Sequence, residues 1–167
     1  MIVLLWPALV LLLYTLQTHW FMFFESTQSP DLLLLFVLMY ALDTGGKEGA
    51  GCGLMVGILQ DVVTFSFFGY HIITRTLLGF LVGSAREKIF RDRIYTFIIL
   101  VVMASFIVKL VYGVTLCIYT HELIPLGRFL LSTFKYVGWN ILCALPVWIL
   151  YRIVREIMER KFNPYYH

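Results

Sequence analysis

Long apolar runs alternate with short polar segments along this sequence. The polar segments are ESTQSP at 25–30, DTGGKE at 43–48, REKIFRDR at 86–93 and a loop at 120–128, with a tight break at 67–69. An α-helix needs about 20 apolar residues to cross a bilayer, and none of the connections is long enough to fold separately. The pattern therefore predicts a single all-α domain, 1–167, with helical spans at about 2–24, 31–42, 49–65, 70–84, 94–119 and 129–151 and a tail at 152–167.

The second apolar run, 31–42, is the weakest of these spans. Its twelve residues rise about 18 Å as a helix, which is less than the roughly 30 Å of a bilayer core. The run must borrow flanking residues, thin the bilayer locally, or fail to cross completely. The positions of the basic residues favour a full crossing, because otherwise one basic cluster would lie on the wrong side of the membrane.

Composition and charge placement turn this pattern into a polytopic membrane protein. The chain has 167 residues, of which 60% are hydrophobic and 14% charged, whereas soluble domains carry about 25% charged residues. The start of the chain, 1–16, lacks a basic n-region and a cleavage site, so we interpret it as a retained span. The positive-inside rule places both termini in the cytoplasm. The basic residues that decide this orientation are Arg86, Lys88, Arg91 and Arg93 in one loop, and Arg152, Arg155, Arg160 and Lys161 in the tail.

Small residues form a stripe along the third predicted helix. Gly49, Gly53, Gly57 and Asp61 recur every four residues, and Gly79 with Gly83 makes a similar notch in the fourth helix. Small residues let membrane helices approach closely and gain packing energy. The stripe therefore predicts either helix packing inside the protein or a groove for the helix of a partner.

Three charged residues are expected at membrane depth. A central Asp costs roughly 2.5–3.5 kcal/mol to insert, so Asp61 should face the interior and have a partner. The turn near Phe68 places Asp61 and Arg75 at one depth, which predicts an ion pair between them. Lys109 then remains as an additional cation. It could extend to the interface, pair with Asp61 while Arg75 reaches the outer surface, or meet an anion from a lipid or partner.

No pattern in the chain indicates catalysis, a cofactor, a metal or nucleic-acid binding. The sequence lacks HExxH, GxSxG and Walker A motifs, and its serines have no base at a suitable spacing. Cys52, Cys117 and Cys143 are isolated within apolar runs, which is typical of buried, inert thiols. His71 lacks a second ligand at metal-binding spacing, so we expect a wet interfacial side chain.

At this point the chain resembles the MreD family of rod shape-determining membrane proteins. The resemblance covers nearly the whole length and rests on SPDLLLLFVLMYAL at 29–42, the glycine-rich block at 49–83, and a last span with Asn140 and Pro146 before the basic tail. Two departures from the family pattern are Gln60 beside Asp61, where an apolar residue is expected, and Lys109.

The resemblance implies a non-catalytic scaffold in the inner (cytoplasmic) membrane of a rod-shaped bacterium. Such a protein acts in the elongasome, the complex that directs lateral peptidoglycan synthesis and maintains cell shape. MreC, a single-span protein with a periplasmic coiled coil, is the expected partner. MreB, RodA and a penicillin-binding transpeptidase belong to the wider complex, and membrane lipid surrounds it. The resemblance also implies a fold similar to the substrate-binding components of energy-coupling-factor transporters.

Two other functions compete with the scaffold. A substrate-binding membrane component of a vitamin transporter would have the same hydropathy, with a polar cavity beneath the outer loops in which Asp61, Arg75 and His71 could lie. A membrane enzyme of lipid metabolism is disfavoured by the missing catalytic constellation. The tail segment 151–162 could form a basic amphipathic helix that lies on anionic lipid or touches a partner, or it could simply set the topology.

Overall fold

The computed structural model describes residues 5–24, 29–64, 67–86, 94–122 and 124–162, and within these ranges it is entirely helical. The predicted all-α fold is therefore confirmed, and most helix boundaries lie within a few residues of their predicted positions. Lys88, Arg91 and Arg93 of the basic loop lie outside the described residues. The helices are α1 (Leu5–Phe24), α2 (Leu32–Thr44), α3 (Gly46–Thr64), α4 (Tyr70–Ala85), α5 (Ile94–Thr120) and α6 (Leu126–Phe162).

The short helix α2 forms the centre of the bundle. All its residues from Leu32 to Met39 are buried, as are Ala41 and Leu42, and it packs against each of the other five helices. A helix that is apolar on every side belongs in a core. Its 13 residues rise about 20 Å. Because its neighbours enclose it, α2 does not have to match the thickness of a bilayer by itself.

Glycines bring α3 and α4 into direct backbone contact. A Cβ atom on Gly53 would lie 2.2 Å from the carbonyl oxygen of Arg75, and one on Gly79 would lie 2.2 Å from that of Gly49. Gly57 and Gly83 are equally tight, with Ile72 and Gly45 as the nearest neighbours. This glycine face is therefore occupied inside the protein, as in the first of the two interpretations above.

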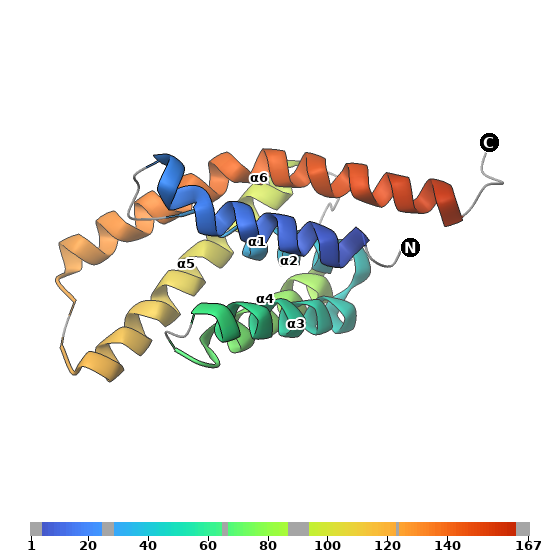
Figure 1. Cartoon of the computed structure of the whole chain (residues 1–167). Coiled ribbons are helices and arrows are strands. Elements are labelled where there is room, and N and C mark those ends of the chain that lie inside the picture. Colours follow the sequence, from blue (N-terminus) through green and yellow to red (C-terminus); the bar gives the residue numbers. More distant parts are fainter. Residues whose placement is uncertain (1–4, 25–28, 65–66, 87–93, 123, 163–167) are drawn as a thin grey trace.

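Helices α5 and α6 are long; α5 runs obliquely across the bundle, and α6 extends along it (Figure 1). Among the described helices, these two are long and apolar enough to span a membrane by themselves. Helix α6 continues through Pro146 and through the predicted tail to Phe162 without a break. Its 37 residues span about 55 Å, well beyond a bilayer core. The start of α1 and the end of α6 lie at the same end of the bundle (Figure 1).

Candidate functional site

Arg75 lies at the centre of a buried polar cluster, but its partner is not the predicted one. Its side chain is completely buried, and its guanidinium forms an ion pair with Asp31. Its Nε donates a hydrogen bond to Oε1 of Gln60 at 3.1 Å. The Asp61–Arg75 pair is therefore wrong. Gln60, which departs from the family pattern, is a direct partner of the buried cation.

Asp31 reaches this cluster because it caps the central helix. Its Oδ1 accepts a hydrogen bond from the backbone N–H of Leu34 at 3.0 Å, which is the N-cap arrangement. Its Oδ2 accepts a second bond from the Tyr136 hydroxyl at 2.8 Å. A buried charge is tolerated only when it is paired and hydrogen-bonded. Asp31 and Arg75 meet this condition for each other, and only Nη1 of the guanidinium is left without a hydrogen-bond partner among the described residues.

A chain of hydrogen bonds extends the cluster across the bundle. The backbone N–H of Asp31 donates to Oδ1 of Asn140 at 2.7 Å, and the Asn140 amide nitrogen donates to Oγ of Ser105 at 2.8 Å. Asn140 and Ser105 are both fully buried. These bonds connect the start of α2 with α5 and α6. The sequence interpretation missed the cluster because Asp31 was taken simply as the first residue of an apolar run.

Asp61 instead holds the turn between α3 and α4. Its carboxylate accepts hydrogen bonds from the backbone N–H groups of Gly69 at 2.8 Å, His71 at 3.1 Å and Ile72 at 3.1 Å. The Nδ1 atom of His71 lies 2.8 Å from the same carboxylate. The first N–H groups of a helix lack partners within the helix and attract negative charge. Asp61 supplies both the acceptor and the charge for α4, and His71 is part of this turn rather than a fully wet side chain.

Lys109 has no carboxylate partner in the part of the chain that the structure describes. Its Nζ lies 3.4 Å from Oγ of Ser132 and over the rings of Tyr136 and Tyr112, at 4.7 and 5.6 Å from their centroids. The alternative in which Lys109 pairs with Asp61 is therefore also wrong. Aromatic faces attract a cation weakly, which leaves the ammonium largely unneutralised.

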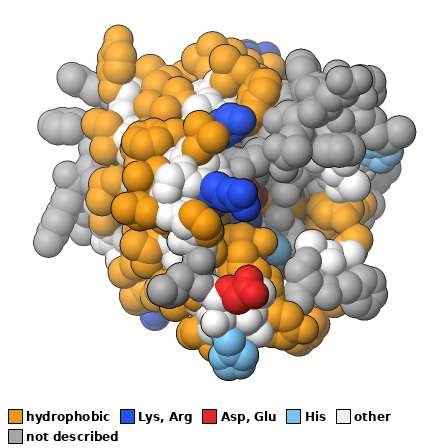
Figure 2. All heavy atoms as spheres, turned by 90° about the vertical axis from the view of Figure 1, so that its left-hand side faces the viewer, with side chains coloured by type: hydrophobic (Ala, Val, Ile, Leu, Met, Phe, Trp, Pro, Cys, Tyr) orange, Lys and Arg blue, Asp and Glu red, His pale blue; other side chains and the backbone are white. Residues whose placement is uncertain are grey.

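Several of these groups, including Asp31, His71, Lys109 and Tyr136, line a cavity of about 500 Å³ at one end of the bundle. It opens at the end where the α3–α4 turn lies, and under the predicted orientation this is the outer end. Figure 2 shows the molecule from this end; among the side chains coloured there, most are hydrophobic and few are charged. The cavity is lined by Gln17, Ser29, Pro30, Asp31, Thr64, Phe67, Tyr70, His71, Val108, Lys109, Tyr112 and Tyr136.

Comparison with protein families decides the identity. The family model described as rod shape-determining protein MreD matches residues 1–157 of the 167-residue chain. The chain belongs to the MreD family. The resemblance seen in the sequence is thus confirmed, together with a role in cell shape and with membership of a membrane-protein family. Searches of the curated proteins and of the solved structures gave no match.

A second polar cluster in this MreD family member lies at the other end of α2. The carboxylate of Asp43 forms an ion pair with Arg155 and accepts a hydrogen bond from the Tyr151 hydroxyl at 3.1 Å. The backbone carbonyl of Asp43 accepts a bond from Arg86 at 3.1 Å. The central helix is therefore attached to α6 at both ends, by Tyr136 and Asn140 at one end and by Tyr151 and Arg155 at the other.

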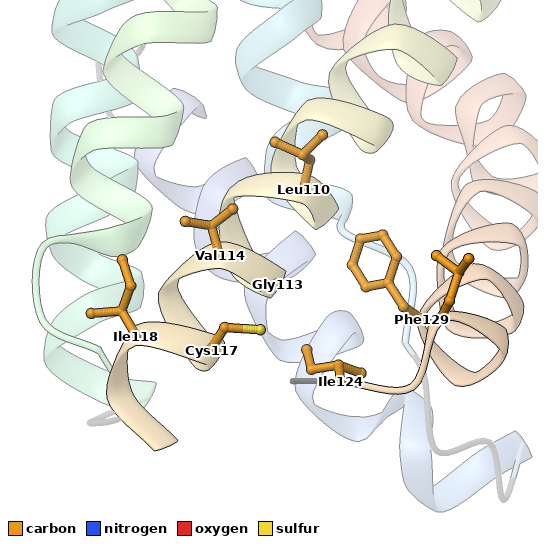
Figure 3. Close-up of a pocket in the computed structure, with 8 residues that line it drawn as sticks. Leu110, Gly113, Val114, Cys117, Ile118, Ile124 and Phe129 are labelled. Carbon is orange, nitrogen blue, oxygen red and sulfur yellow. The ribbon is translucent and has the colours of Figure 1, made fainter. Parts of the chain in front are cut away.

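An apolar pocket of about 350 Å³ separates the ends of α5 and α6 (Figure 3). Leu110, Val114 and Ile118 of α5 line it together with Phe129 of α6. Apart from the thiol of Cys117, the lining is hydrocarbon, which suits an apolar occupant. Among the described residues, no group of three His, Cys, Asp or Glu side chains is placed to hold a metal ion.

Proposed function

We propose that this chain is a non-catalytic scaffold of the bacterial cell-wall elongation complex, in which it binds MreC in the inner membrane. The match to the MreD family over residues 1–157 carries this proposal. The polar cluster supports a structural role, because Arg75, Asp31 and Asp61 are engaged in holding helices together. Because these contacts fix the helices relative to one another, the bundle can serve as a rigid platform for other membrane proteins.

The proposal includes six spans with both termini in the cytoplasm. The start of α1 and the end of α6 lie at one end of the bundle (Figure 1), as an even number of crossings requires. Helix α6 is longer than a bilayer core, so its last turns, with Arg152, Arg155 and Arg160, extend beyond the membrane. Basic residues next to a span favour the cytoplasmic side.

The partner should bind through membrane helices, because the segments at the outer end are short. The inner glycine face is occupied by α3 and α4 themselves, so another face must be used. A shallow groove of about 480 Å³ lies on α3 and α4, away from the glycine face between them, and it is lined almost entirely by hydrocarbon. Gly51, beside it on α3, has open space around it. We assign the helix of MreC to this groove, which is lined by Ala50, Leu54, Ile72, Ile73, Thr76, Leu77 and Phe80.

Affinity purification of the tagged full-length chain from native membranes in mild detergent tests the proposal. Recovery of a single-span coiled-coil protein, together with wall synthases, is the expected result. Recovery of ATPases with a coupling subunit would contradict it and favour the vitamin-transporter alternative, for which the cavity beside Lys109 would be the ligand site. Turnover of a membrane lipid by the purified protein would instead contradict the absence of catalysis.

A further inference from the structure

The cavity beside Lys109 contains donors that the protein itself does not use. The ammonium group has three N–H donors and no acceptor, and its one described hydrogen bond, to Ser132, is long at 3.4 Å. Tyr112 also lines the cavity, and within the described chain its hydroxyl makes no hydrogen bond. Both groups are therefore free to bind a ligand that carries acceptor oxygens.

The charges around the cavity select the kind of anion. Asp31 forms an ion pair with Arg75, and Asp61 accepts hydrogen bonds from the start of α4 and lies in hydrogen-bond contact with His71. Lys109 forms no ion pair with either of these carboxylates. A ligand with one negative charge matches the single ammonium, and a second negative charge would find no other Lys or Arg among the described residues that line the cavity.

The level of Lys109 in the bundle points to the membrane interface. The Tyr70 hydroxyl donates a hydrogen bond to the carbonyl of Val108 at 2.7 Å, so Lys109 lies beside the first turn of α4. Under the proposed orientation, this turn is at the outer end of the α3–α4 hairpin, where lipid headgroups lie. The common monoanion at that level is the phosphodiester of a phospholipid.

We propose that the Lys109 cavity binds a phosphodiester monoanion, with Lys109 and Tyr112 as its donors. The ammonium binds the phosphate oxygens as a point charge, and the tyrosine hydroxyl adds a directed hydrogen bond. The cavity volume of about 500 Å³ accommodates a headgroup. The proposal rests on the proposed orientation of the bundle but not on the binding of MreC.

Binding to the purified full-length protein in detergent micelles tests the proposal. The probes are dioctanoyl phosphatidylglycerol and glycerophosphoglycerol, which is the same phosphodiester without acyl chains. A hydrogen bond to a charged group contributes about 1.5–3 kcal/mol, so Lys109→Met should weaken binding by about ten- to a hundredfold. Lys109→Arg keeps the charge and should retain most of the affinity, and Tyr112→Phe should weaken binding to a smaller extent.

Lys135→Met is the matched control, because Lys135 is an exposed lysine on α6. It should bind both probes like the natural chain. Binding of the lipid alone identifies a headgroup site, and equal binding of both probes identifies a site for a soluble phosphodiester; either result supports the proposal. Binding that is unchanged in Lys109→Met would overturn it. Loss of MreC recovery in that variant, with no phosphodiester binding by the natural chain, would overturn it in favour of an acidic partner.

Discussion

Asp31 and Arg75, 44 positions apart in the sequence, form an ion pair in the interior of the bundle. One residue caps the central helix α2, and the other projects from the middle of α4. Such pairs specify the register between helices more dependably than they add net stability. The pair therefore defines how far α2 is inserted between its neighbours, and Asp31 also lines the cavity beside Lys109.

Removal of one partner should be far more damaging than removal of both. Asp31→Asn leaves the buried guanidinium of Arg75 without a counter-charge, which should cost about 3–5 kcal/mol of unfolding free energy. The double variant Asp31→Asn/Arg75→Gln should cost less than the sum of the two single variants. Denaturant unfolding in mixed micelles measures all three values.

Asp43→Asn is the control for that experiment. Its partner Arg155 has a side chain that is 36% exposed, so solvent screens the pair, and the cost should be about 1 kcal/mol or less. Equal costs for Asp31→Asn and Asp43→Asn would contradict the central role of the Asp31–Arg75 pair.

Asp61→Ala should loosen the α3–α4 turn. The substitution leaves three backbone N–H groups and His71 without their acceptor, at a cost of about 1–3 kcal/mol. Asp61→Asn keeps one acceptor oxygen and should be milder. Because the turn supports the groove assigned to MreC, Asp61→Ala should impair complex recovery more than membrane insertion. Undiminished recovery with that variant would count against the assignment.

Two glycines on α3 should respond in opposite ways to the same substitution. Gly53→Ala forces a Cβ atom against the backbone of Arg75 and should destabilise the protein by about 1–3 kcal/mol. Gly51→Ala meets open space and should be neutral or stabilising by up to about 1 kcal/mol, because alanine favours a helix. Thermal unfolding in detergent compares them, and equal destabilisation would contradict the packing described for α3 and α4.

Cysteine labelling in intact cells tests the proposed topology. After replacement of Cys52, Cys117 and Cys143, a cysteine in place of His121 should react with a membrane-impermeant maleimide from outside. A cysteine in place of Glu48 should react only after the inner membrane is permeabilised. Both positions are exposed in the structure, so access from one side alone distinguishes them. The reverse pattern would invert the orientation, and equal labelling of both would rule out the six-span arrangement.

The sequence predicted the helices well because their boundaries depend on local signals. Polar segments and glycines mark the ends of α2, α3 and α4 within two or three residues of their observed positions. The basic residues of the tail led us to end the last predicted helix at the membrane boundary, near residue 151. The structure continues α6 to Phe162, because the i,i+4 pairs Arg155–Glu159 and Glu156–Arg160 support the helix there.

The polar cluster was harder to predict because it depends on which helix occupies the centre. The prediction that Asp61 and Arg75 are buried was correct, but it considered only the two helices that are joined by the turn near Phe68. Asp31 belongs to a different helix, and nothing in the hydrophobic periodicity places α2 between α4 and α6. Gln60 was a usable signal: a polar residue at an expected apolar position, fifteen residues from Arg75, marks a buried partner.

Site-specific photo-cross-linking in living cells tests most directly whether the chain holds MreC on its α3–α4 groove. A photoreactive amino acid replaces Ile73, which lines the groove, or Leu142 on α6 as a control; these side chains are 65% and 64% exposed. The account predicts an adduct with the single-span coiled-coil protein from position 73 and none from position 142. An adduct from position 142 alone, or an adduct of position 73 with a transporter coupling subunit, would contradict it.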